Sequence, residues 1–276
     1  MKETTATTRV YALLGDPVEH SLSPVMQNRA FAEMGADAVY VALRVDADLV
    51  GPVMRALARA GGGGNVTIPH KAVAARALDD VTPAVRATGA CNLFWWEDSR
   101  GLCGDNSDVS AFRAAAEGLL DSRLSGLRVL LVGAGGAARA VAFGCIEAGA
   151  IVWIVNRTRS RAETLSRDLG RPAALTVLGD DEEVVGKRFD LAVNATPLGL
   201  RSSDPLPLDL DALELGAALD LVYSPSGTRW VHEARRRGLP AEDGRRMLAL
   251  QAGVALRRWL GREPSLSLLY GVLGLD

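Results

Sequence analysis

Residues 127–161, LRVLLVGAGGAARAVAFGCIEAGAIVWIVNRTRSR, contain the pattern that decides the fold. The run from Val129 to Val132 is apolar throughout, which is typical of a strand buried on both faces. A glycine-rich turn follows, then a helical run that stops at Gly149, and a second apolar strand from Ile151 to Val155. A strand, a glycine turn, a helix and a strand in about thirty residues form a βαβ unit, the context in which G-x-G-x-x-[GA] predicts a dinucleotide site.

The glycine turn suits phosphate binding for several reasons. Gly133 permits the tight turn, Gly135 lets the backbone approach a pyrophosphate, and Ala138 is small enough for the helix to lie against the strand. The free N–H groups and the positive end of the helix dipole then hold the phosphates. The candidate residues of this turn are Gly133, Ala134, Gly135, Gly136 and Ala137.

The residues after the second strand select the cofactor. NAD-preferring sites usually place Asp or Glu there, whereas this chain has Asn156, Arg157 and Thr158, with Arg161 beyond. A carboxylate would repel a 2′-phosphate, but arginines can bind it through paired charge-assisted hydrogen bonds. The sequence therefore predicts NADP rather than NAD. The alternative, a glycine turn followed by a solvated basic helix start, is disfavoured by the βαβ context.

The composition is that of an ordinary globular protein, with 48% apolar and 23% charged residues in a chain of 276. A net charge of −2 gives no reason to expect nucleic acid or an anionic membrane as a partner. The polar start has no apolar h-region, and no apolar run approaches the length of a membrane span. The three cysteines and three histidines form no disulfide framework and no metal-ligand pattern. We therefore expect a cytoplasmic protein without a bound metal.

Strands and helices alternate along the chain, as in a parallel α/β layer over the first hundred residues, and the alternation restarts near residue 126. We expect two α/β domains with a cleft between them, and ligands beyond the carboxyl ends of the strands. A glycine turn is expected over 61–64. The expected strands are 10–14, 39–43, 65–68, 90–94, 129–132, 151–155, 188–193 and 217–222, and the expected helices are 24–34, 47–60, 109–120 and 247–260, with another beginning at 71.

Two charged residues in polar loops after expected strands, Lys71 and Asp108, are the candidates for proton transfer. Hydride transfer at an alcohol carbon needs a group that takes or gives the hydroxyl proton. A lysine side chain is protonated at neutral pH and can donate in the reducing direction, whereas as a base it needs desolvation or a nearby cation. Taken alone, a lysine after Pro-His is more often a solvated helix start.

Neutral hydrogen-bonding residues in loops or at element ends suit a substrate rich in hydroxyl groups. They are Ser21, Ser23, Thr67, Asn92 and Gln251. Each alone is more often a cap or a turn residue. Tyr223 can either reach the substrate or pack, and the residues by themselves do not decide between these roles.

Taken in order, these stretches resemble the shikimate dehydrogenase family over nearly the whole chain. The resemblance is specific because many motifs recur in one order. In the substrate half, the matching stretches are GDPVEHSLSP (15–24), NVTIPHK (65–71), GACN (89–92), GDNSD (104–108) and MLALQAG (247–253). In the cofactor half, they are VGAGGAARAV (132–141), NRT (156–158), NATPLG (194–199) and DLVYSP (220–225).

The resemblance implies a fold and a reaction. The fold is α/β, with a substrate-binding catalytic domain of residues 1–107 and 247–276 and a Rossmann NADP-binding domain of residues 108–246, so that the C-terminal helices return to the first domain. The reaction is the reversible, NADP-dependent reduction of 3-dehydroshikimate to shikimate on the chorismate route to aromatic amino acids. The implied assembly is a monomer or a homodimer.

The resemblance also implies residue roles, with Lys71 as the acid/base and Asp108 as its partner and a substrate contact. The implied substrate-binding residues are Ser21, Ser23, Thr67, Lys71, Asn92, Asp108, Tyr223 and Gln251. The implied cofactor-binding residues are Gly133 to Ala137, Asn156, Arg157, Thr158, Arg161, Thr196, Leu221 and Gly244. The chain departs from the family pattern at Gln27, Cys91, Leu93, Ser107 and Ala111. These departures remove no named catalytic group and bear on substrate preference and rate.

Three other functions compete with this interpretation. A quinate or quinate/shikimate dehydrogenase would be supported by NAD preference and quinate turnover, while Arg157 and Ser23 argue against it. An enzyme of the folate-linked methylenetetrahydrofolate dehydrogenase type gives no account of the Ser-Leu-Ser loop. A non-catalytic NADP-binding regulator would keep the glycine turn but need neither Lys71 nor Asp108.

Overall fold

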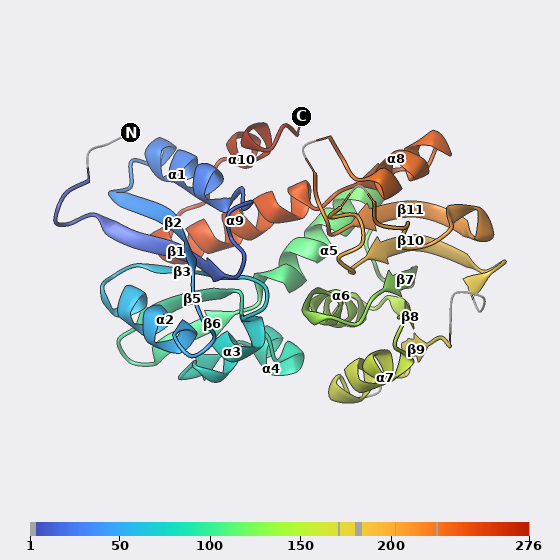
Figure 1. Ribbon diagram of the computed structural model, residues 1–276, viewed down its shortest axis with the longest axis horizontal. Coiled ribbons are helices and arrows are strands. Elements are labelled where there is room, and N and C mark those ends of the chain that lie inside the picture. The colour runs from blue at the N-terminus through green and yellow to red at the C-terminus, as the bar shows by residue number, and fades with distance from the viewer. Residues whose placement is uncertain (1–3, 171, 180–183, 202, 225, 276) are drawn as a thin grey trace. The chain divides into compact units, whose positions relative to one another are not determined.

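The computed structural model describes residues 4–170, 172–179, 184–201, 203–224 and 226–275 (Figure 1). The chain divides into two compact units: unit 1 is Met1–Ser107 with Leu248–Asp276, and unit 2 is Asp108–Met247. The expected division put residue 247 in the first domain, whereas its contacts place it in unit 2. The outermost residues of the expected bounds, 1–3 and 276, lie outside the described residues. Each unit has its own sheet and helices, which confirms the expected α/β class.

Unit 1 is built on a six-stranded sheet in the order β2-β1-β3-β5-β6-β4. β1 runs parallel to β2 and β3, and β4 parallel to β6, but β5 runs antiparallel to both β3 and β6. The expected parallel arrangement holds for β1, β2 and β3 and is wrong for β5, because the short loop 98–100 between β5 and β6 cannot make the crossover that a parallel pair requires. The strands are β1 (Arg9–Gly15), β2 (Ala38–Arg44), β3 (Gly63–Val66), β4 (Asp80–Val81), β5 (Leu93–Glu97) and β6 (Gly101–Asp105).

Two strands of unit 1 differ from the expected ranges. β3 starts and ends earlier, so that Gly64 belongs to a strand rather than to a glycine turn. A Cβ at Gly64 would collide with the carbonyl oxygen of Ala12 on β1, and glycine therefore lets the two strands pair. β5 starts later than expected, which leaves residues 90–92 in the loop before it.

Alternation along β1 distributes the core of unit 1 over both faces of its sheet. Tyr11 and Leu13 lie in one cluster with α1 (Ser23–Glu33), α9 (Arg245–Leu260) and α10 (Leu266–Val272). Ala12 and Leu14 lie in the other, with α2 (Val50–Arg59), α3 (Lys71–Arg76) and α4 (Pro83–Thr88). Figure 1 shows α1 and α10 on one side of this sheet and α2, α3 and α4 on the other. A period of two is what a strand requires when helices cover both faces of its sheet.

Unit 2 is built on a six-stranded sheet in the order β12-β11-β10-β7-β8-β9, in which every recorded pair is parallel. The order reverses between β7 and β10, which is the arrangement of a Rossmann fold and its topological switch point. The strands are β7 (Arg128–Val132), β8 (Ile151–Val155), β9 (Leu175–Val177), β10 (Arg188–Asn194), β11 (Glu214–Asp220) and β12 (Ala241–Glu242). The helices are α5 (Ser107–Leu120), α6 (Gly136–Glu147), α7 (Arg159–Asp168), α8 (Arg229–Arg236) and the 3-10 turn η2 (Leu210–Ala212).

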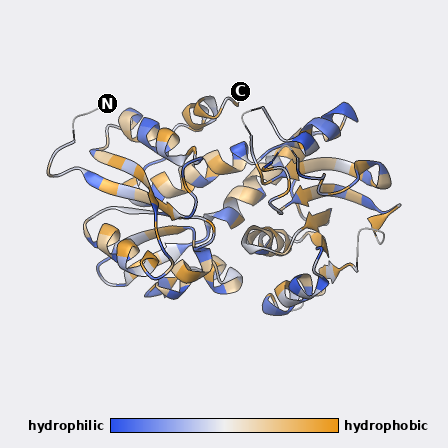
Figure 2. Ribbon diagram, in the orientation of Figure 1, coloured by the Kyte–Doolittle hydropathy of each residue, from blue (hydrophilic) through white to orange (hydrophobic). Residues whose placement is uncertain are grey.

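The apolar strands of unit 2 form the core that the sequence predicts. All residues from Val129 to Val132 are buried, and helices cover a sheet of this kind on both faces. Figure 2 shows hydrophobic residues along β7 and β8 and hydrophilic ones over much of α7 and α8. β11 ends at Asp220 instead of residue 222, because the Asp220 side chain accepts a hydrogen bond from the Val222 N–H (3.0 Å) just beyond the strand.

None of the described helices combines the length and the apolar character needed to cross a membrane. Within the same described residues, no group of His, Cys, Asp and Glu side chains could hold a metal ion.

Candidate active site

The glycine turn after β7 has the backbone geometry of a phosphate-binding turn. Gly133 has a φ of +114°, and a Cβ there would lie 3.0 Å from the carbonyl oxygen of Ala195. A side chain at this position would therefore be strained and crowded. The Gly133 N–H donates to the Val155 carbonyl (2.8 Å), which fixes the turn beside the end of β8.

The helix that follows this turn presents an open N-terminus. Gly135 is the N-cap of α6 and no described side chain caps the helix; its first hydrogen bond runs from the Arg139 N–H to the Gly135 carbonyl (3.0 Å). No neighbouring described atom lies within 4 Å of where a Cβ would stand at Gly135 or Gly136. The N–H groups of a first helical turn lack intrahelical acceptors, so this end of α6 is suited to bind an anion. Ala138 is buried, as the packing of helix on strand requires.

The segment after β8 supplies positive charge. Arg157 and Arg161 are exposed, and within the described residues no ion pair neutralises either guanidinium. The Asn156 side chain donates to the Thr158 carbonyl (2.7 Å), which shapes the turn before α7. No carboxylate follows β8 at the position where it would repel a 2′-phosphate.

Three further cofactor candidates converge at the same edge of the sheet. Thr196 follows β10, and its methyl group would lie 3.1 Å from a Cβ at Gly133. The Leu221 N–H donates to the carbonyl of Asn194, the last residue of β10 (2.9 Å). A Cβ at Gly244 would collide with the Leu221 carbonyl, so glycine is required there too. The loops after β7, β10 and β11 thus meet at the carboxyl ends of the strands.

Two substrate candidates lie in a loop of unit 1 that follows β1. The hydroxyl of Ser21 accepts the N–H of Ser23 (3.2 Å), and Ser23 begins α1. The loop starts beside Thr67, because a Cβ at Gly15 would collide with the Thr67 methyl group, and the Asp16 N–H donates to the Ile68 carbonyl (3.0 Å). The loops after the paired strands β1 and β3 are therefore neighbours.

Lys71 and Asn92 are brought together by the backbone. Lys71 is the first residue of α3, and its carbonyl accepts the Cys91 N–H (2.9 Å). The carbonyl of Asn92 accepts the Val66 N–H (3.0 Å) and the side-chain amide of Asn65 (3.0 Å). Lys71, Thr67 and Asn92 therefore occupy one region of unit 1, at the end of β3.

The Asn92 side chain has a fixed orientation. Its Oδ1 accepts both the backbone N–H (2.8 Å) and the hydroxyl (3.1 Å) of Ser107. Because a backbone N–H can only donate, Oδ1 must face Ser107 and the Nδ2 group, which donates, faces elsewhere. Asp108 is the next residue along the chain, buried in the first turn of α5, and it belongs to unit 2. Gln251 is half-buried on α9, in unit 1.

Comparison with known proteins identifies the family. The family described as "Shikimate dehydrogenase substrate binding domain" matches residues 13–94, and "Shikimate / quinate 5-dehydrogenase" matches residues 114–198. A shikimate dehydrogenase (NADP(+)) from Salinibacter ruber is 39% identical over 98% of this chain and 99% of its own. The chain belongs to the shikimate dehydrogenase family.

Solved structures of this family share the fold. Shikimate dehydrogenase from Aquifex aeolicus aligns with a TM-score of 0.88 at 30% identity, covering 98% of each chain. Shikimate 5-dehydrogenase from Thermus thermophilus, in complex with NADP(H) and shikimate, aligns with a TM-score of 0.85 at 36% identity, covering 96% of this chain and 98% of that one. Membership makes the chain an NADP-dependent oxidoreductase that acts on a CH–OH group.

The residues of unit 2 fit the NADP of this family. The open N-terminus of α6 offers N–H groups to a pyrophosphate, and two arginines that no described ion pair neutralises follow β8. Tyr223 is half-buried, and its ring would lie 3.4 Å from a Cβ at Gly244, so it packs against the loop that holds Gly244.

The positions that depart from the family pattern have different surroundings. Ser107 keeps the hydroxyl that holds Asn92. Cys91 is buried, donates to the Leu93 carbonyl (3.3 Å) and has its pKa raised to about 12, mainly by desolvation, so its thiol stays neutral. Ala111 is buried in α5. Gln27 is buried on α1, and its Oε1 has no hydrogen-bond partner in the described part of the chain.

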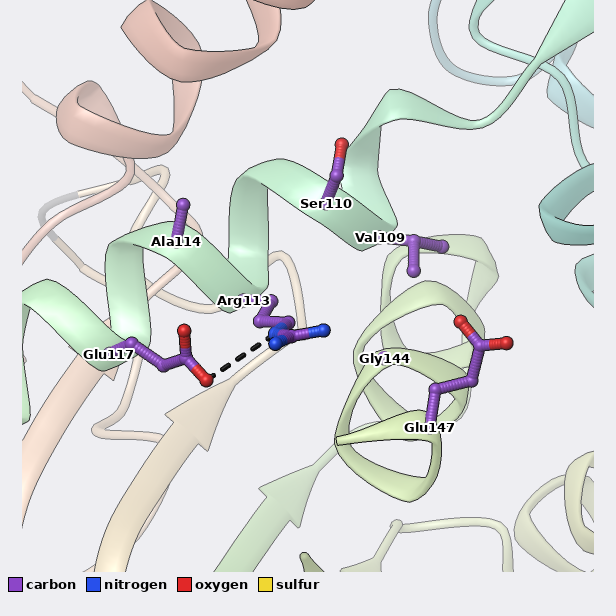
Figure 3. A pocket seen from close by; sticks show the side chains of 7 residues that line it. All are labelled: Val109, Ser110, Arg113, Ala114, Glu117, Gly144 and Glu147. Carbon is purple, nitrogen blue, oxygen red and sulfur yellow. Dashed lines mark hydrogen bonds and ion pairs between the residues drawn. The ribbon is translucent and has the colours of Figure 1, made fainter. Parts of the chain in front are cut away.

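A cavity of about 310 Å³ lies elsewhere in unit 2, between α5 and α6 (Figure 3). The ion pair between Arg113 and Glu117 (3.3 Å) lines it from α5, and Gly144 and Glu147 line it from α6. Gly144 is about 12 Å along α6 from its first residue, at 1.5 Å of rise per residue. This cavity is therefore not the phosphate site at the glycine turn.

Three polar residues to which the sequence assigned no role hold the cofactor-side loops, although two of them open the stretches 194–199 and 220–225. They are Asn194, Asp220 and Thr228, all buried. Asn194 and Asp220 are each the polar last residue of an apolar strand, which is a signal that the sequence contains. Their mutual contact is not such a signal, because it depends on the pairing of strands that are distant in the sequence.

Proposed function

We propose that this chain catalyses the reversible, NADP-dependent reduction of 3-dehydroshikimate to shikimate. The observation that carries the proposal is the grouping of Lys71 with Thr67 and Asn92 at one edge of the unit 1 sheet, in a chain whose second unit has the fitting NADP half-site. Family membership supports the substrate, because similar enzymes are named shikimate dehydrogenases.

The bound cofactor supplies the hydride for the carbonyl carbon. In the reducing direction Lys71 donates the proton to the carbonyl oxygen, and in the reverse direction it accepts that proton. Its backbone is fixed at the start of α3, because its carbonyl accepts the Cys91 N–H, and this supports the proposed role. Asp108 acts as its partner and binds a substrate hydroxyl.

The remaining substrate residues bind hydroxyl and carboxylate groups. Asn92 presents its Nδ2 as a donor, because Ser107 holds the Oδ1. Ser21 and Ser23 lie on the loop beside Thr67 and bind the carboxylate and ring hydroxyls together with it. Tyr223 and Gln251 complete the substrate set.

The deciding assay measures shikimate and quinate oxidation with NADP and with NAD on the purified protein. We expect turnover of shikimate with NADP. Quinate is the second candidate, since the family that matches residues 114–198 is described as shikimate / quinate 5-dehydrogenase. Preferential quinate turnover with NAD would replace the proposed substrate and cofactor, and turnover of neither would support a non-catalytic NADP-binding protein.

Lys71→Ala tests the acid–base role. This variant should keep its NADPH affinity and lose about two orders of magnitude or more in kcat, the typical worth of general acid–base catalysis. Lys187→Ala is the matched control, because Lys187 lies in the loop before β10, at the opposite end of that strand from Thr196. A Lys71→Ala enzyme with near-normal kcat would remove this residue from the mechanism.

A cytoplasmic location and a monomeric or homodimeric assembly remain predictions. Cell fractionation checks the location. Sedimentation with and without NADPH measures the assembly.

A further inference from the structure

Asn194 and Asp220 form a polar pair in the core of unit 2. They are the last residues of β10 and β11 and stand opposite each other in the register of these parallel strands. Each side chain is 0% exposed. Amide and carboxylate side chains are rarely buried this deeply unless hydrogen bonds satisfy them.

The Asp220 carboxylate accepts three hydrogen bonds. Oδ1 accepts the Asn194 side-chain amide (2.8 Å) and the Val222 N–H (3.0 Å), and Oδ2 accepts the Thr228 hydroxyl (2.7 Å). All three partners donate, so the ionised carboxylate satisfies them and is satisfied by them. Thr228 in turn caps α8 by accepting the Val231 N–H (3.3 Å).

Asn194 extends the same hydrogen-bond network into the loop that follows β10. Its Nδ2 also donates to the Leu198 carbonyl (3.0 Å), and its Oδ1 accepts the Thr196 N–H (3.0 Å) and hydroxyl (2.7 Å). The Ala195 N–H donates to the Val132 carbonyl at the end of β7 (2.9 Å). The loop after β10 is therefore fixed at both sides, to the strand before the glycine turn and to Asp220.

Burying the Asp220 carboxylate costs free energy, because the charged group loses its hydration. Desolvation raises its pKa to about 6, against the lowering effect of its three hydrogen bonds, and Asp243 adds a smaller repulsion. Asp243 is itself paired with Arg245 (2.9 Å). Burial disfavours the charge of Asp220, so the carboxylate is a poor source of stability. We infer that it serves to position the two loops.

We propose that Asp220 is a positioning residue for the cofactor: through Asn194, Val222 and Thr228 it fixes the loops 195–199 and 221–224 against the glycine turn. These loops contain Thr196, Leu221 and Tyr223, and Gly133 packs on the first of them. The ionised carboxylate acts as the common acceptor for both loops. This inference rests on the proposed cofactor site, because the two loops can position the cofactor only if NADP binds there.

Asp220→Asn is the direct test, since asparagine keeps the shape but removes the charge and replaces one acceptor oxygen with an N–H donor. Both the Kd and the KM for NADPH should rise about tenfold, because neutral hydrogen bonds replace those to a charged acceptor, and kcat should fall while the KM for shikimate stays within about twofold. NADPH binding is measured by its fluorescence, and the kinetic constants by absorbance.

A second pair of variants keeps the test decisive if Asp220→Asn folds poorly. Thr228→Val removes a donor and should raise the NADPH Kd about fivefold or more, while Thr228→Ser keeps the hydroxyl and should restore wild-type affinity. Asp190→Asn is the matched control: Asp190 accepts the Arg128 N–H (2.7 Å) and lies near the start of β10, toward the opposite end of that strand from Asn194.

The outcomes separate the inference from the function on which it rests. NADPH affinity in Asp220→Asn and Thr228→Val within about twofold of wild type, or an equal loss in Asp190→Asn, would overturn the positioning role. A wild-type protein that neither binds NADPH nor oxidises shikimate would instead overturn the proposed function. Selective loss in the Asp220 and Thr228→Val variants, with rescue by Thr228→Ser, supports the inference.

Discussion

Burial and hydrogen bonding act in opposite directions on Asp220. Desolvation is the larger effect and raises its pKa from 3.8 to about 6, although Thr228, Val222 and Asn194 all donate to the carboxylate. In the unfolded chain the carboxyl group has an ordinary pKa, so the folded protein binds an additional proton between about pH 4 and pH 6. The stability that protonated Asp220 contributes is therefore complete below about pH 4 and is lost as pH rises through about 6.

Asp220→Asn should abolish this component of the pH dependence. Between about pH 4 and pH 6.5 the wild type should lose on the order of 1–3 kcal/mol relative to the variant, whose side chain does not titrate. Urea unfolding at several pH values measures this difference. Parallel stability curves for the two proteins would show that Asp220 is not the group responsible.

Arg157 is the residue that should distinguish the two dinucleotides. Its exposed guanidinium lacks an ion-pair partner among the described residues, so a 2′-phosphate would be its main electrostatic contact. Arg157→Ala should weaken NADP binding about tenfold or more and change NAD binding by no more than about twofold. Arg167→Ala, an exposed arginine in the last turn of α7, is the control. Titrations of the wild type and both variants with NADP and with NAD measure these affinities. Equal losses of affinity for the two cofactors in Arg157→Ala would contradict a 2′-phosphate contact.

At the scale of elements, the two helices α5 and α6 are packed through a glycine. A Cβ at Gly144 would lie 3.3 Å from the Val109 carbonyl oxygen and 3.6 Å from the Phe112 ring. Figure 3 shows Gly144 on α6 beside Val109 of α5, at the border of the cavity. One added methyl group needs a small shift, whereas a branched side chain adds bulk at this close contact and needs a larger one.

Gly144→Val should therefore lower the free energy of unfolding by about 1–3 kcal/mol, the usual cost of overpacking. Gly144→Ala is the matched variant, and its better helix propensity, worth about 1 kcal/mol, offsets the crowding. Thermal unfolding of both proteins measures the difference. A valine variant as stable as wild type would mean that α5 and α6 are not closely packed.

The sequence predicts the central strands β7 and β8 of unit 2 closely, for a physical reason. Strands buried on both faces are continuous apolar runs, and β8 has the bounds expected for it. In unit 1, β3 contains glycines that pair closely with β1, and those glycines suggest a turn. The antiparallel direction of β5 and β6 was not predicted either, because strand direction depends on pairing and not on the local sequence pattern.

The residues of the candidate site can be named from the sequence where they form motifs, but not where they depend on long-range contacts. The glycine turn and Lys71 can be recognised from neighbouring residues alone. The bond from Ser107 to Asn92 and the bond from Asn194 to Asp220 join residues on different elements. Such contacts follow from sheet order, which a single sequence does not reveal.

At the scale of the whole molecule, the chain leaves unit 1 after Ser107 and returns to it at Leu248. The returning helix α9 carries Trp259, whose ring lies 4.6 Å from that of Tyr11 and whose Nε1–H donates to the Phe94 carbonyl (3.3 Å). The last part of the chain thereby completes the core of the first part.

Trp259→Ala should destabilise unit 1 by about 2–4 kcal/mol through lost packing while leaving NADPH affinity nearly unchanged. Hydrogen exchange should show reduced protection in β1 and β5 and normal protection in β7 and β10. Trp153→Ala is the reciprocal control, because Trp153 packs on Phe189 in unit 2 (5.6 Å) and should produce the opposite pattern. If each variant reduced protection equally in all four strands, the two units would not unfold separately.

The split of unit 1 along the chain has a consequence for biosynthesis. A nascent polypeptide emerges from the ribosome N-terminus first, and domains generally fold as units during translation. The inserted unit, Asp108–Met247, is translated before most of α9 and all of α10. Tyr11 and Phe31 therefore lack the cover of α9 and α10 until those helices are translated, so this part of the unit 1 core is exposed to proteases after the inserted unit has been made.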